Sequence, residues 1–318
     1  MGFRKKKLEK RVVTVFEELH DLGGGTGFVG RHLKKALLED GFKVTVVSRK
    51  PGPKEASWNT VTWNDITKCG IPEDVTAVVN VAGENILNPL KRWNKEFKDE
   101  VVKSRTATTK TLANAIISSK KPPKLFATVS GVAAYKPSPK AEYTEYSEVK
   151  PYDFLSQLVQ DWEKAAELPR SLNVRQVIVR SGVVLGRDGG MIKELYYPFY
   201  FGLGGTFGFG GSQWLPWIHV QDLCGIFMHA IKNDNVSGIL NGTAESATNS
   251  DFTNAFAAAL HRPAIFPVPS FVMNTIFGSE RGKVILEGQN VKPVRTLESR
   301  YKFKYFDIKS ACKNCVTV

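Results

Sequence analysis

Apolar and polar residues alternate in blocks through the first half of the chain, and the blocks predict strands and helices in turn. Short runs rich in valine and other β-branched residues predict buried strands at 43–48, 76–83, 124–131 and 175–186. Apolar residues three or four positions apart predict amphipathic helices at 29–41, 93–119 and 154–168. Strands that alternate with helices indicate an α/β fold, a Rossmann-like, doubly wound parallel sheet with helices on both faces.

The pattern changes after Gly186. Glycine and aromatic residues crowd positions 189–217, and residues 217–231 predict a short strand that leads into a helix. A Thr/Asn/Ser cap followed by an apolar stripe predicts a further helix at 248–260. We therefore expect residues 186–318 to form a small C-terminal α+β lobe that holds the substrate and is partly interleaved with the domain before it.

The first strand of the predicted Rossmann domain, placed at 22–185, is less certain. The good strand pattern "RVVTVF" lies at 11–16, and six acidic or weakly strand-forming residues separate it from Gly23. Three alternatives stay open: a bulge separates the two, "HDLGG" itself forms a poor first strand, or the N-terminus is a variant one. Residues 1–21 are treated as a basic N-terminal segment.

A glycine cluster precedes the first predicted helix. Gly24, Gly27 and Gly30 form G-x-x-G-x-x-G, followed by an amphipathic helix and a strand. Such a turn needs glycine conformations, and a diphosphate must approach bare backbone amides at the positive end of a helix. The third glycine lets the helix pack closely on the sheet. This pattern predicts a dinucleotide site that includes Phe28 and Val29.

The end of the second strand indicates which dinucleotide is bound. NAD-binding folds place an acidic residue about 20 positions after the glycines to hold the ribose hydroxyl. This chain has Ser48, Arg49 and Lys50 there instead. A guanidinium matches a 2′-phosphate in bidentate fashion, which favours NADP over NAD. The alternative is that Arg49 and Lys50 are surface charges beside a turn at 51–53.

The net charge suggests a second possible function, nucleic-acid binding. The 318 residues carry a formal net charge of +13, which raises the question of nucleic-acid binding. The lysines and arginines are scattered apart from a cluster at 4–11, and no zinc-finger or RNP pattern is present. We interpret the charge as a solvated basic surface that attracts an anionic cofactor or substrate, and we expect no nucleic-acid partner.

Apolar runs and cysteines bear on location. No apolar run reaches the roughly 18 residues of a membrane span, so we expect no membrane association. The basic start lacks the apolar stretch of a secretory signal, and the cysteines are few, which predicts an intracellular, cytoplasmic or nuclear location. A mitochondrial location stays open, although residues 7–21 are rich in acids.

The Cys312-x-x-Cys315 pair predicts free thiols in a frayed tail rather than a metal site. The oligomeric state is left open.

Four further motifs carry a family resemblance. The chain contains "VVSRKPG", "NVAGENILNPLKRWN", "RSGVVLG" and "PWIHVQDL" after the glycines. In combination these resemble the extended short-chain dehydrogenase/reductases and, more narrowly, their epimerase-like family 39U, a group of NADP-dependent oxidoreductases. The resemblance covers roughly residues 22–305. It implies that NADP lies across the carboxyl edge of the sheet.

The resemblance also implies cofactor contacts. Ser48 and Arg49 are expected to contact the 2′-phosphate region, and Val81 and Ala82 to pass beneath the cofactor. Small residues at the end of a strand, here Ala82 and Gly83, also allow a close backbone approach.

Three more positions follow from the same resemblance. Glu100 and Arg105 are expected to lie near the cofactor, and Val184 to close its nicotinamide end. For Glu100 and Arg105, an ordinary exposed ion pair is an equally good interpretation.

The catalytic residues of short-chain reductases are only partly present. These enzymes use a Ser or Thr, a Tyr and a Lys four residues after the Tyr, because a phenol needs help to exchange a proton near neutral pH. Ser130 fits the Ser position. In the matching stretch, however, Tyr152 is followed four positions later by Ser156, and Phe154 by Leu158. The resemblance to family 39U implies that this absence is a trait of the subgroup.

Other residues can be considered for chemistry. Tyr135, a phenol near the right strand, and His219 could each substitute for the missing Tyr-x-x-x-Lys pair, and we expect Ser130 and Tyr135 to be the catalytic residues. Trp214, Trp217 and His219 are expected to wall the substrate side, because ligands usually sit in a cleft between lobes. A buried Tyr or His is, however, more often structural. Asp222 is expected to cap the helix that follows it.

Three readings of function result. The favoured one is an NADP-dependent oxidoreductase acting on an unknown carbonyl, alcohol or sugar-nucleotide substrate. The second is a non-catalytic NADP(H)-binding sensor or scaffold that lacks the Tyr-x-x-x-Lys pair. The third is a nucleic-acid-binding protein with a vestigial Rossmann domain.

Overall fold

A parallel sheet forms the centre of the protein. The structure, a computed structural model, describes residues 12–16, 19–20, 25–48, 57–83, 85–87, 91–208 and 210–317. Within this part of the chain the sheet has seven strands in the order β12-β9-β7-β6-β1-β4-β5, with every neighbouring pair parallel. The strands are β1 (Val12–Phe16), β4 (Lys43–Ser48), β5 (Asn59–Thr62), β6 (Val75–Asn80), β7 (Leu125–Gly131), β9 (Arg175–Ser181) and β12 (Gly238–Gly242).

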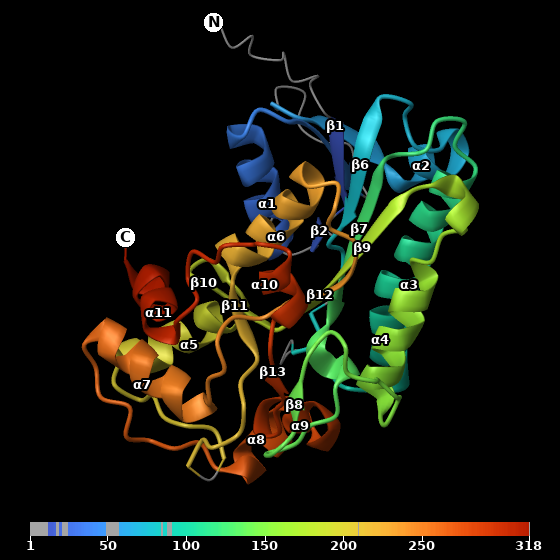
Figure 1. The fold of residues 1–318 in the computed structure, drawn as a ribbon. Coiled ribbons are helices and arrows are strands. Elements are labelled where there is room, and N and C mark those ends of the chain that lie inside the picture. The colour runs from blue at the N-terminus through green and yellow to red at the C-terminus, as the bar shows by residue number, and fades with distance from the viewer. Residues whose placement is uncertain are drawn as a thin grey trace, which may run out of the picture.

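Helices cover both faces of this sheet (Figure 1). On one face lie α1 (Phe28–Glu39) and α6 (Val220–Lys232); on the other lie α2 (Trp63–Cys69), α3 (Lys95–Ile117) and α4 (Phe154–Ala165). Strand residues alternate between the two cores: Ala77 and Val79 pack with α1 and α6, whereas Val78 packs with α2 and α3. The α/β, Rossmann-like fold predicted from the sequence is confirmed.

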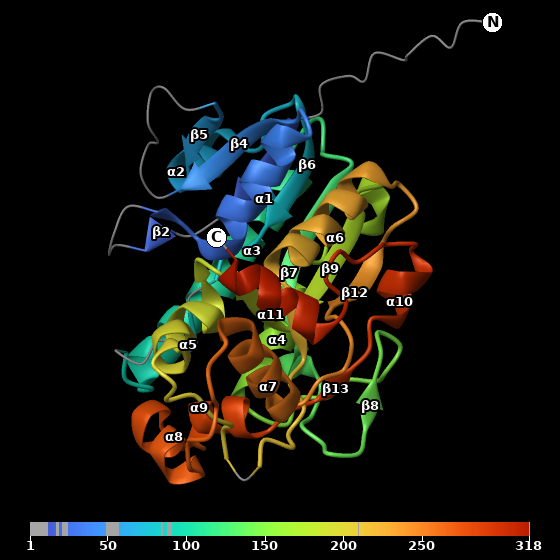
Figure 2. The ribbon, with the colours of Figure 1, turned by 90° about the vertical axis from the view of Figure 1, so that its left-hand side faces the viewer.

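A smaller lobe lies at the carboxyl edge of the sheet (Figure 2). It contains a two-stranded parallel pair, β10 (Val183–Gly186) with β11 (Trp217–His219), and a second such pair, β8 (Glu142–Tyr143) with β13 (Asn290–Val291). Its helices are α5 (Gly190–Tyr200), α7 (Asn249–Leu260), α8 (Ser270–Phe277), α9 (Ser279–Leu286), α10 (Val294–Glu298) and α11 (Ile308–Val316). Short 3-10 turns occupy Val132–Ala134 and Arg170–Leu172. No helix of the described ranges has the length and apolar character of a membrane span.

The first strand of the sheet forms at the early strand pattern, 11–16, and not at the glycines. β1 occupies Val12–Phe16 and pairs with β4 and β6, at the centre of the sheet. A two-residue antiparallel pair, β2 (Leu19–His20) with β3 (Gly25–Thr26), then separates β1 from α1. The alternative in which "HDLGG" forms the first strand is therefore wrong. The sheet also takes in β12, so it extends past both bounds of 22–185; the domain boundaries themselves stay a prediction.

The C-terminus forms a helix and is not a frayed tail, so that prediction is wrong. Asp307 caps α11, because its carboxylate accepts a hydrogen bond from the Ser310 backbone amide (2.9 Å). Cys312 and Cys315, on the same side of the helix, are fully buried against α7 and β10 as free thiols. Burial raises the pKa of both thiols.

Asp222 anchors the segment that leads to this helix. Its carboxylate accepts hydrogen bonds from the Tyr301 hydroxyl (3.0 Å) and from the backbone amides of Lys304 (2.7 Å) and Tyr305 (2.8 Å). His219, not Asp222, caps α6, since its Nδ1 accepts from the Gln221 amide (3.2 Å). The expectation that Asp222 is the cap is wrong because the carboxylate faces residues 301–305.

Removing this carboxylate should destabilise the whole protein. Asp222 is fully buried, so Asp222→Ala leaves two backbone amides without acceptors, at a cost of about 2–5 kcal/mol in the free energy of unfolding. Urea unfolding followed by circular dichroism measures this loss. Asp99→Ala, on the exposed face of α3, is the matched control and should change the same free energy by less than about 0.5 kcal/mol. Equal stabilities of the two variants would contradict the anchoring role.

Candidate functional site

The topology places a ligand site at one position of the sheet. The chain leaves β1 towards β4 on one side, and β6 pairs with β1 on the other side. In open sheets of this kind ligands bind outside the carboxyl ends of the strands, where the strand order reverses. The N-terminus of α1 lies at this point of reversal.

The first turn of α1 presents bare amides. Gly27 is its N-cap, no side chain accepts a hydrogen bond there, and the first turn has no acidic residue. The amides of Phe28, Val29 and Gly30 have no partner within the helix, because the first backbone bond runs from Arg31 N to Gly27 O (2.9 Å). Such a helix end binds anions, and a diphosphate suits it. Gly24 lies outside the described residues.

The β10–α5 turn is fastened to this helix end. Phe28 packs so closely on the turn that a Cβ atom added to Gly189 would lie 2.3 Å from Phe28 Cδ2. Asp188 pairs with Arg31 (Nη2 to Oδ2, 3.0 Å) and with His32 (Nε2 to Oδ1, 2.9 Å). Burial alone would raise the pKa of Asp188, but the hydrogen bond and charge of His32 and the charge of Arg31 lower it. The turn therefore has a fixed place beside the amides.

Two strand ends border the same point. Ser48 ends β4 and is buried, whereas Arg49 and Lys50 lie outside the described residues. Asn80, the last residue of β6, fixes the chain that follows. Its Nδ2 donates to Thr109 Oγ1 (2.8 Å), and its Oδ1 accepts from Ala82 N (3.1 Å). Val81 and Ala82 are thereby held at the carboxyl edge of the sheet.

The structure gives Glu100 and Arg105 different surroundings. Glu100 is exposed and pairs with Lys91 Nζ (2.8 Å). Arg105 lies with its guanidinium 5.1 Å from the ring centroid of Trp162, and a Cβ atom added to Gly83 would lie 3.3 Å from Arg105 Cζ. Arg105 is therefore placed against the strand end at residues 81–83, where the sequence predicts the cofactor. The roles of both residues stay predictions.

Ser130 and Tyr135 belong to a buried polar network. Arg180 is almost fully buried and makes two hydrogen bonds to the Glu163 carboxylate, both 2.8 Å. Ser130 Oγ donates to the same carboxylate (2.8 Å). The Tyr135 hydroxyl accepts from Arg180 Nη1 (3.1 Å) and lies 2.9 Å from Asn241 Oδ1, to which it donates. Both hydroxyls therefore have protein partners, and burial raises the pKa of Tyr135. Their assignment as a catalytic pair stays a prediction.

The residues predicted for the nicotinamide and substrate side lie on β10 and β11. Val184, half-buried, pairs with Ile218. Trp217 is fully buried in the core of the lobe, where its Nε1 has no acceptor among the described residues. His219 is also buried, with its ring 4.2 Å from that of Tyr305. Both side chains have packing contacts, and their assignment to the substrate side stays a prediction.

A cleft of about 470 Å³ opens between the sheet and the lobe. Val132 and Ala133, which follow β7, and Val183 of β10 place it at the carboxyl edge of the sheet. Its walls carry aromatic and charged side chains that include Trp93, Tyr152, Phe154, Trp214, Lys283 and Glu287. Trp214 was expected on the substrate side, but the cleft residues at 280–289 were not predicted. No local sequence pattern shows that α9 returns to this edge of the sheet.

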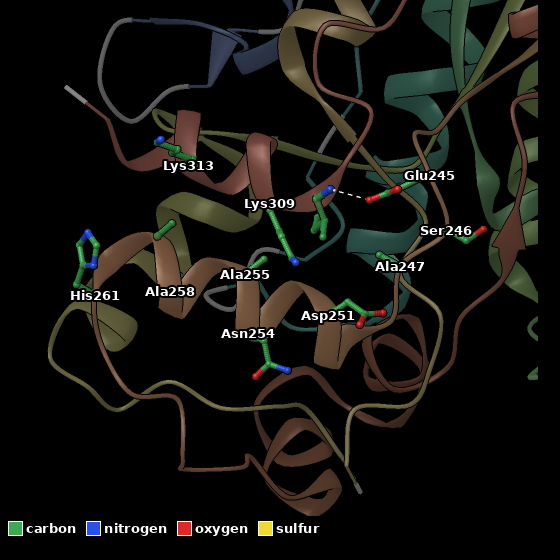
Figure 3. Close-up of a pocket in the computed structure, with 12 residues that line it drawn as sticks. Glu245, Ser246, Ala247, Asp251, Asn254, Ala255, Ala258, His261, Lys309 and Lys313 are labelled. Atoms are coloured by element: carbon green, nitrogen blue, oxygen red, sulfur yellow. Dashed lines mark hydrogen bonds between the residues drawn. The ribbon is translucent and has the colours of Figure 1, made fainter.

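A wider hollow of about 910 Å³ lies within the lobe, between α7 and α11 (Figure 3). Ala255 and Ala258 of α7 form its floor below Lys309, and Glu245 accepts a hydrogen bond from the Ile308 amide (3.0 Å). None of the described cofactor or catalytic candidates lines it. They do not line the cleft either, but the cleft lies at the carboxyl edge, beside the ends of β7 and the start of β10, and includes Trp214, so it is the candidate site.

The fold and the open helix end define a class of protein: a dinucleotide-binding fold of the extended short-chain dehydrogenase/reductase type. A family model described as "NAD dependent epimerase/dehydratase family" matches residues 22–241, and a model of a domain of unknown function, DUF1731, matches residues 268–315. The chain belongs to the NAD dependent epimerase/dehydratase family.

Individual relatives narrow this class. The epimerase family protein SDR39U1 of Bos taurus is 50% identical over 297 residues, which cover 93% of this chain and 98% of that protein. A crystal structure of human epimerase family protein SDR39U1 (isoform 2) with NADPH is 48% identical and superposes with a TM-score of 0.89, covering 96% of this chain and 98% of that one. The resemblance to family 39U is thereby confirmed. UDP-N-acetylglucosamine 4-epimerase from Bacillus cereus, 16% identical with a TM-score of 0.73 over 96% of this chain and 98% of that one, shares the fold.

His219 should make stability depend on pH. Burial, and then the charges of His32 and Lys304, lower its pKa from 6.5 to about 4. The unfolded chain therefore takes up this proton at a higher pH than the folded one, so stabilisation present above pH 6.5 is lost as the pH falls towards 4. His219→Asn keeps a helix cap but cannot titrate. We therefore expect the unfolding free energy of the parent to fall by about 2 kcal/mol more than that of His219→Asn when the pH is lowered from 7 to 5.

Urea unfolding at the two pH values measures this difference. His229→Asn serves as a control for histidine loss elsewhere on α6. Parallel pH dependences of the parent and His219→Asn would contradict the assignment.

Proposed function

We propose that the protein is an NADP-dependent oxidoreductase of the extended short-chain dehydrogenase/reductase type, which interconverts a carbonyl and an alcohol in the cleft. The observation that carries the proposal is the open N-terminus of α1, with its uncapped amides and without an acidic residue. The NADPH in the structure of human SDR39U1 supports the choice of cofactor.

The described residues fit such a cofactor. The amides of Phe28, Val29 and Gly30 would hold the diphosphate at the helix end. Ser48 and Arg49 would take the 2′-phosphate, with the arginine matching it in bidentate fashion. Val81 and Ala82, held by Asn80, offer a small-residue surface on which a flat ring can lie close to the backbone.

Three other positions complete this arrangement. Arg105 lies against the strand end at residues 81–83, over which the cofactor would pass, and Glu100 pairs with Lys91. Val184 would close the nicotinamide end, because β10 leads directly into the turn that Phe28 and Asp188 fasten to α1. The Rossmann domain would thus enclose the cofactor between α1 and β10.

When bound, NADPH supplies a hydride to a carbonyl carbon, and a proton added to the oxygen completes the alcohol. The chain's own residues orient the substrate and exclude water. Aromatic side chains of the cleft, Trp93, Phe154 and Trp214, would provide flat walls for the substrate, and Val183, which also lines the cleft, precedes Val184, the residue expected at the nicotinamide end. Fixed walls of this kind hold a substrate close to a reacting ring, which is a large part of catalysis.

A second candidate, an NADP(H)-binding sensor or scaffold, is favoured by one observation. Both hydroxyls considered for proton transfer, Ser130 and Tyr135, are buried and hydrogen bonded to the network around Arg180. No lysine stands four residues after Tyr152. A protein of this kind would bind the dinucleotide tightly and turn over nothing.

One experiment separates the two candidates. The purified chain is titrated with NADPH, with NADH as control, and nicotinamide fluorescence reports binding. A panel of carbonyl compounds and sugar nucleotides is then supplied, and loss of absorbance at the nicotinamide band reports turnover. Turnover of any member supports the oxidoreductase, and tight binding without turnover across the panel supports the sensor. Failure to bind either dinucleotide contradicts both.

Arg49 should decide between the two dinucleotides. Arg49→Asp removes a charge-assisted contact to the 2′-phosphate and adds a repulsive charge, so we expect the Kd for NADPH to rise about 10- to 100-fold. The Kd for NADH should change less than about threefold, since NADH carries no 2′-phosphate. Arg170→Asp, an exposed arginine in the turn Arg170–Leu172, makes the same charge change elsewhere and should leave both Kd values near those of the parent. An equal effect on NADPH and NADH would contradict the assignment.

A further inference from the structure

The ionisable side chains of the cleft are mostly acidic. Among the described residues, Asp153, Glu280 and Glu287 line it, with Lys283 as the one cation. The Glu280 carboxylate already has partners, because Lys98 Nζ lies 2.6 Å from it and Trp93 Nε1 donates to it. Among the described lining side chains, Asp153 and Glu287 therefore exceed Lys283 by one negative charge, and Arg281 lies behind this wall with its guanidinium 5.5 Å from the Trp93 ring centroid.

Tyr152 lines the cleft together with these two carboxylates. Burial is the largest cause of its raised pKa, and the negative charges of Asp153 and Glu287 raise it further. The two carboxylates therefore act on the same part of the cleft, from α4's N-terminus and from the end of α9. An anionic group placed beside this phenol would meet the same repulsion.

Hydrogen-bond donors of the cleft already have backbone acceptors. Trp214 Nε1 donates to Pro139 O (3.1 Å), and Gln289 Nε2 donates to Tyr135 O (2.9 Å). Gln213 Nε2 donates to Phe207 O (2.9 Å). A diphosphate is normally held by arginine, lysine or free amides, and among the described lining residues Lys283 is the one side chain of that kind.

The surfaces that remain for a ligand are aromatic and apolar. Trp93 and Phe154 meet edge to face, with ring centroids 5.6 Å apart, on one wall. Trp214 lies on another wall, and Val284 of α9 adds apolar surface. Aromatic rings stack on such walls and gain both burial and ring–ring attraction.

We propose that the cleft takes an uncharged aromatic carbonyl compound or the corresponding alcohol, and that it excludes nucleoside diphosphate sugars. The inference rests on the proposed function, since that function defines the cleft as the substrate site. It differs from the sugar-nucleotide option, because a diphosphate needs several cations or free amides, whereas Lys283 is the one cation among the described lining side chains.

Two probes that differ in one charge test the proposal on the full chain. Methyl 4-formylbenzoate is neutral and 4-formylbenzoate is its anionic counterpart; both are titrated by calorimetry into the protein saturated with NADP, alongside UDP-glucose. We expect the ester to bind about tenfold more tightly than the carboxylate and UDP-glucose to give no binding heat. Comparable binding of the carboxylate, binding of UDP-glucose, or no binding of the ester would overturn the proposal.

A charge-reversal variant adds a second readout. Glu287→Lys should reduce the preference for the ester over the carboxylate several-fold, and Glu287→Gln should reduce it less. Glu73→Lys, an exposed change before β6, should leave the preference unaltered. An unchanged preference in both Glu287 variants would overturn the proposal.

Cofactor binding is measured first and separately. If NADPH does not bind, the proposed function fails; the ester and carboxylate titrations in protein without cofactor still decide whether the cleft selects neutral aromatic ligands.

Discussion

The proposed cofactor site depends on the backbone amides at the start of α1. Phe28, Val29 and Gly30 have donors that the helix itself cannot use, and neither a capping side chain nor an acid in the first turn satisfies them. These donors lie where the strand order of the sheet reverses, so they face the crevice at its carboxyl edge. Asn80 and the pairing of Asp188 with Arg31 and His32 hold the neighbouring segments against this point. The positions of strands, turn and helix are therefore all consistent with one bound anion.

The network around Arg180 explains how the same edge is kept rigid. A guanidinium that is almost fully buried needs its charge matched, and the carboxylate of Glu163 on α4 does so by accepting two hydrogen bonds from Arg180 on β9. Tyr135 and Asn241 continue the network to β12, and Ser130 ties it to β7. Hydroxyls that the short-chain reductase pattern associates with proton transfer thus connect three strands and a helix. A network in which every donor and acceptor is satisfied favours one fixed arrangement.

The sequence predicted the repeating part of the fold and half of the site. Runs of β-branched residues and helical apolar stripes located the strands at 43–48 and 124–131 and the long helices, because those patterns are local. The first strand stayed open, since β2 and β3 separate Val12–Phe16 from the glycines and no pattern in the intervening acids predicts such a pair. The glycines identified the helix end, but the acidic wall from α9 depends on how the chain returns to the sheet.

Net charge says little about either site. The chain is basic, at +13, yet the cleft that would hold the substrate carries Asp153 and Glu287 against Lys283. The helix end of α1 has an amide-rich, acid-free first turn, whereas the described lining of this cleft has more carboxylates than cations. Under the proposed function, phosphate-bearing molecules are attracted to α1 and repelled from the cleft, so cofactor and substrate do not compete for one place. Selectivity of this kind comes from repulsion as much as from attraction, because a wrong ligand meets an unmatched charge.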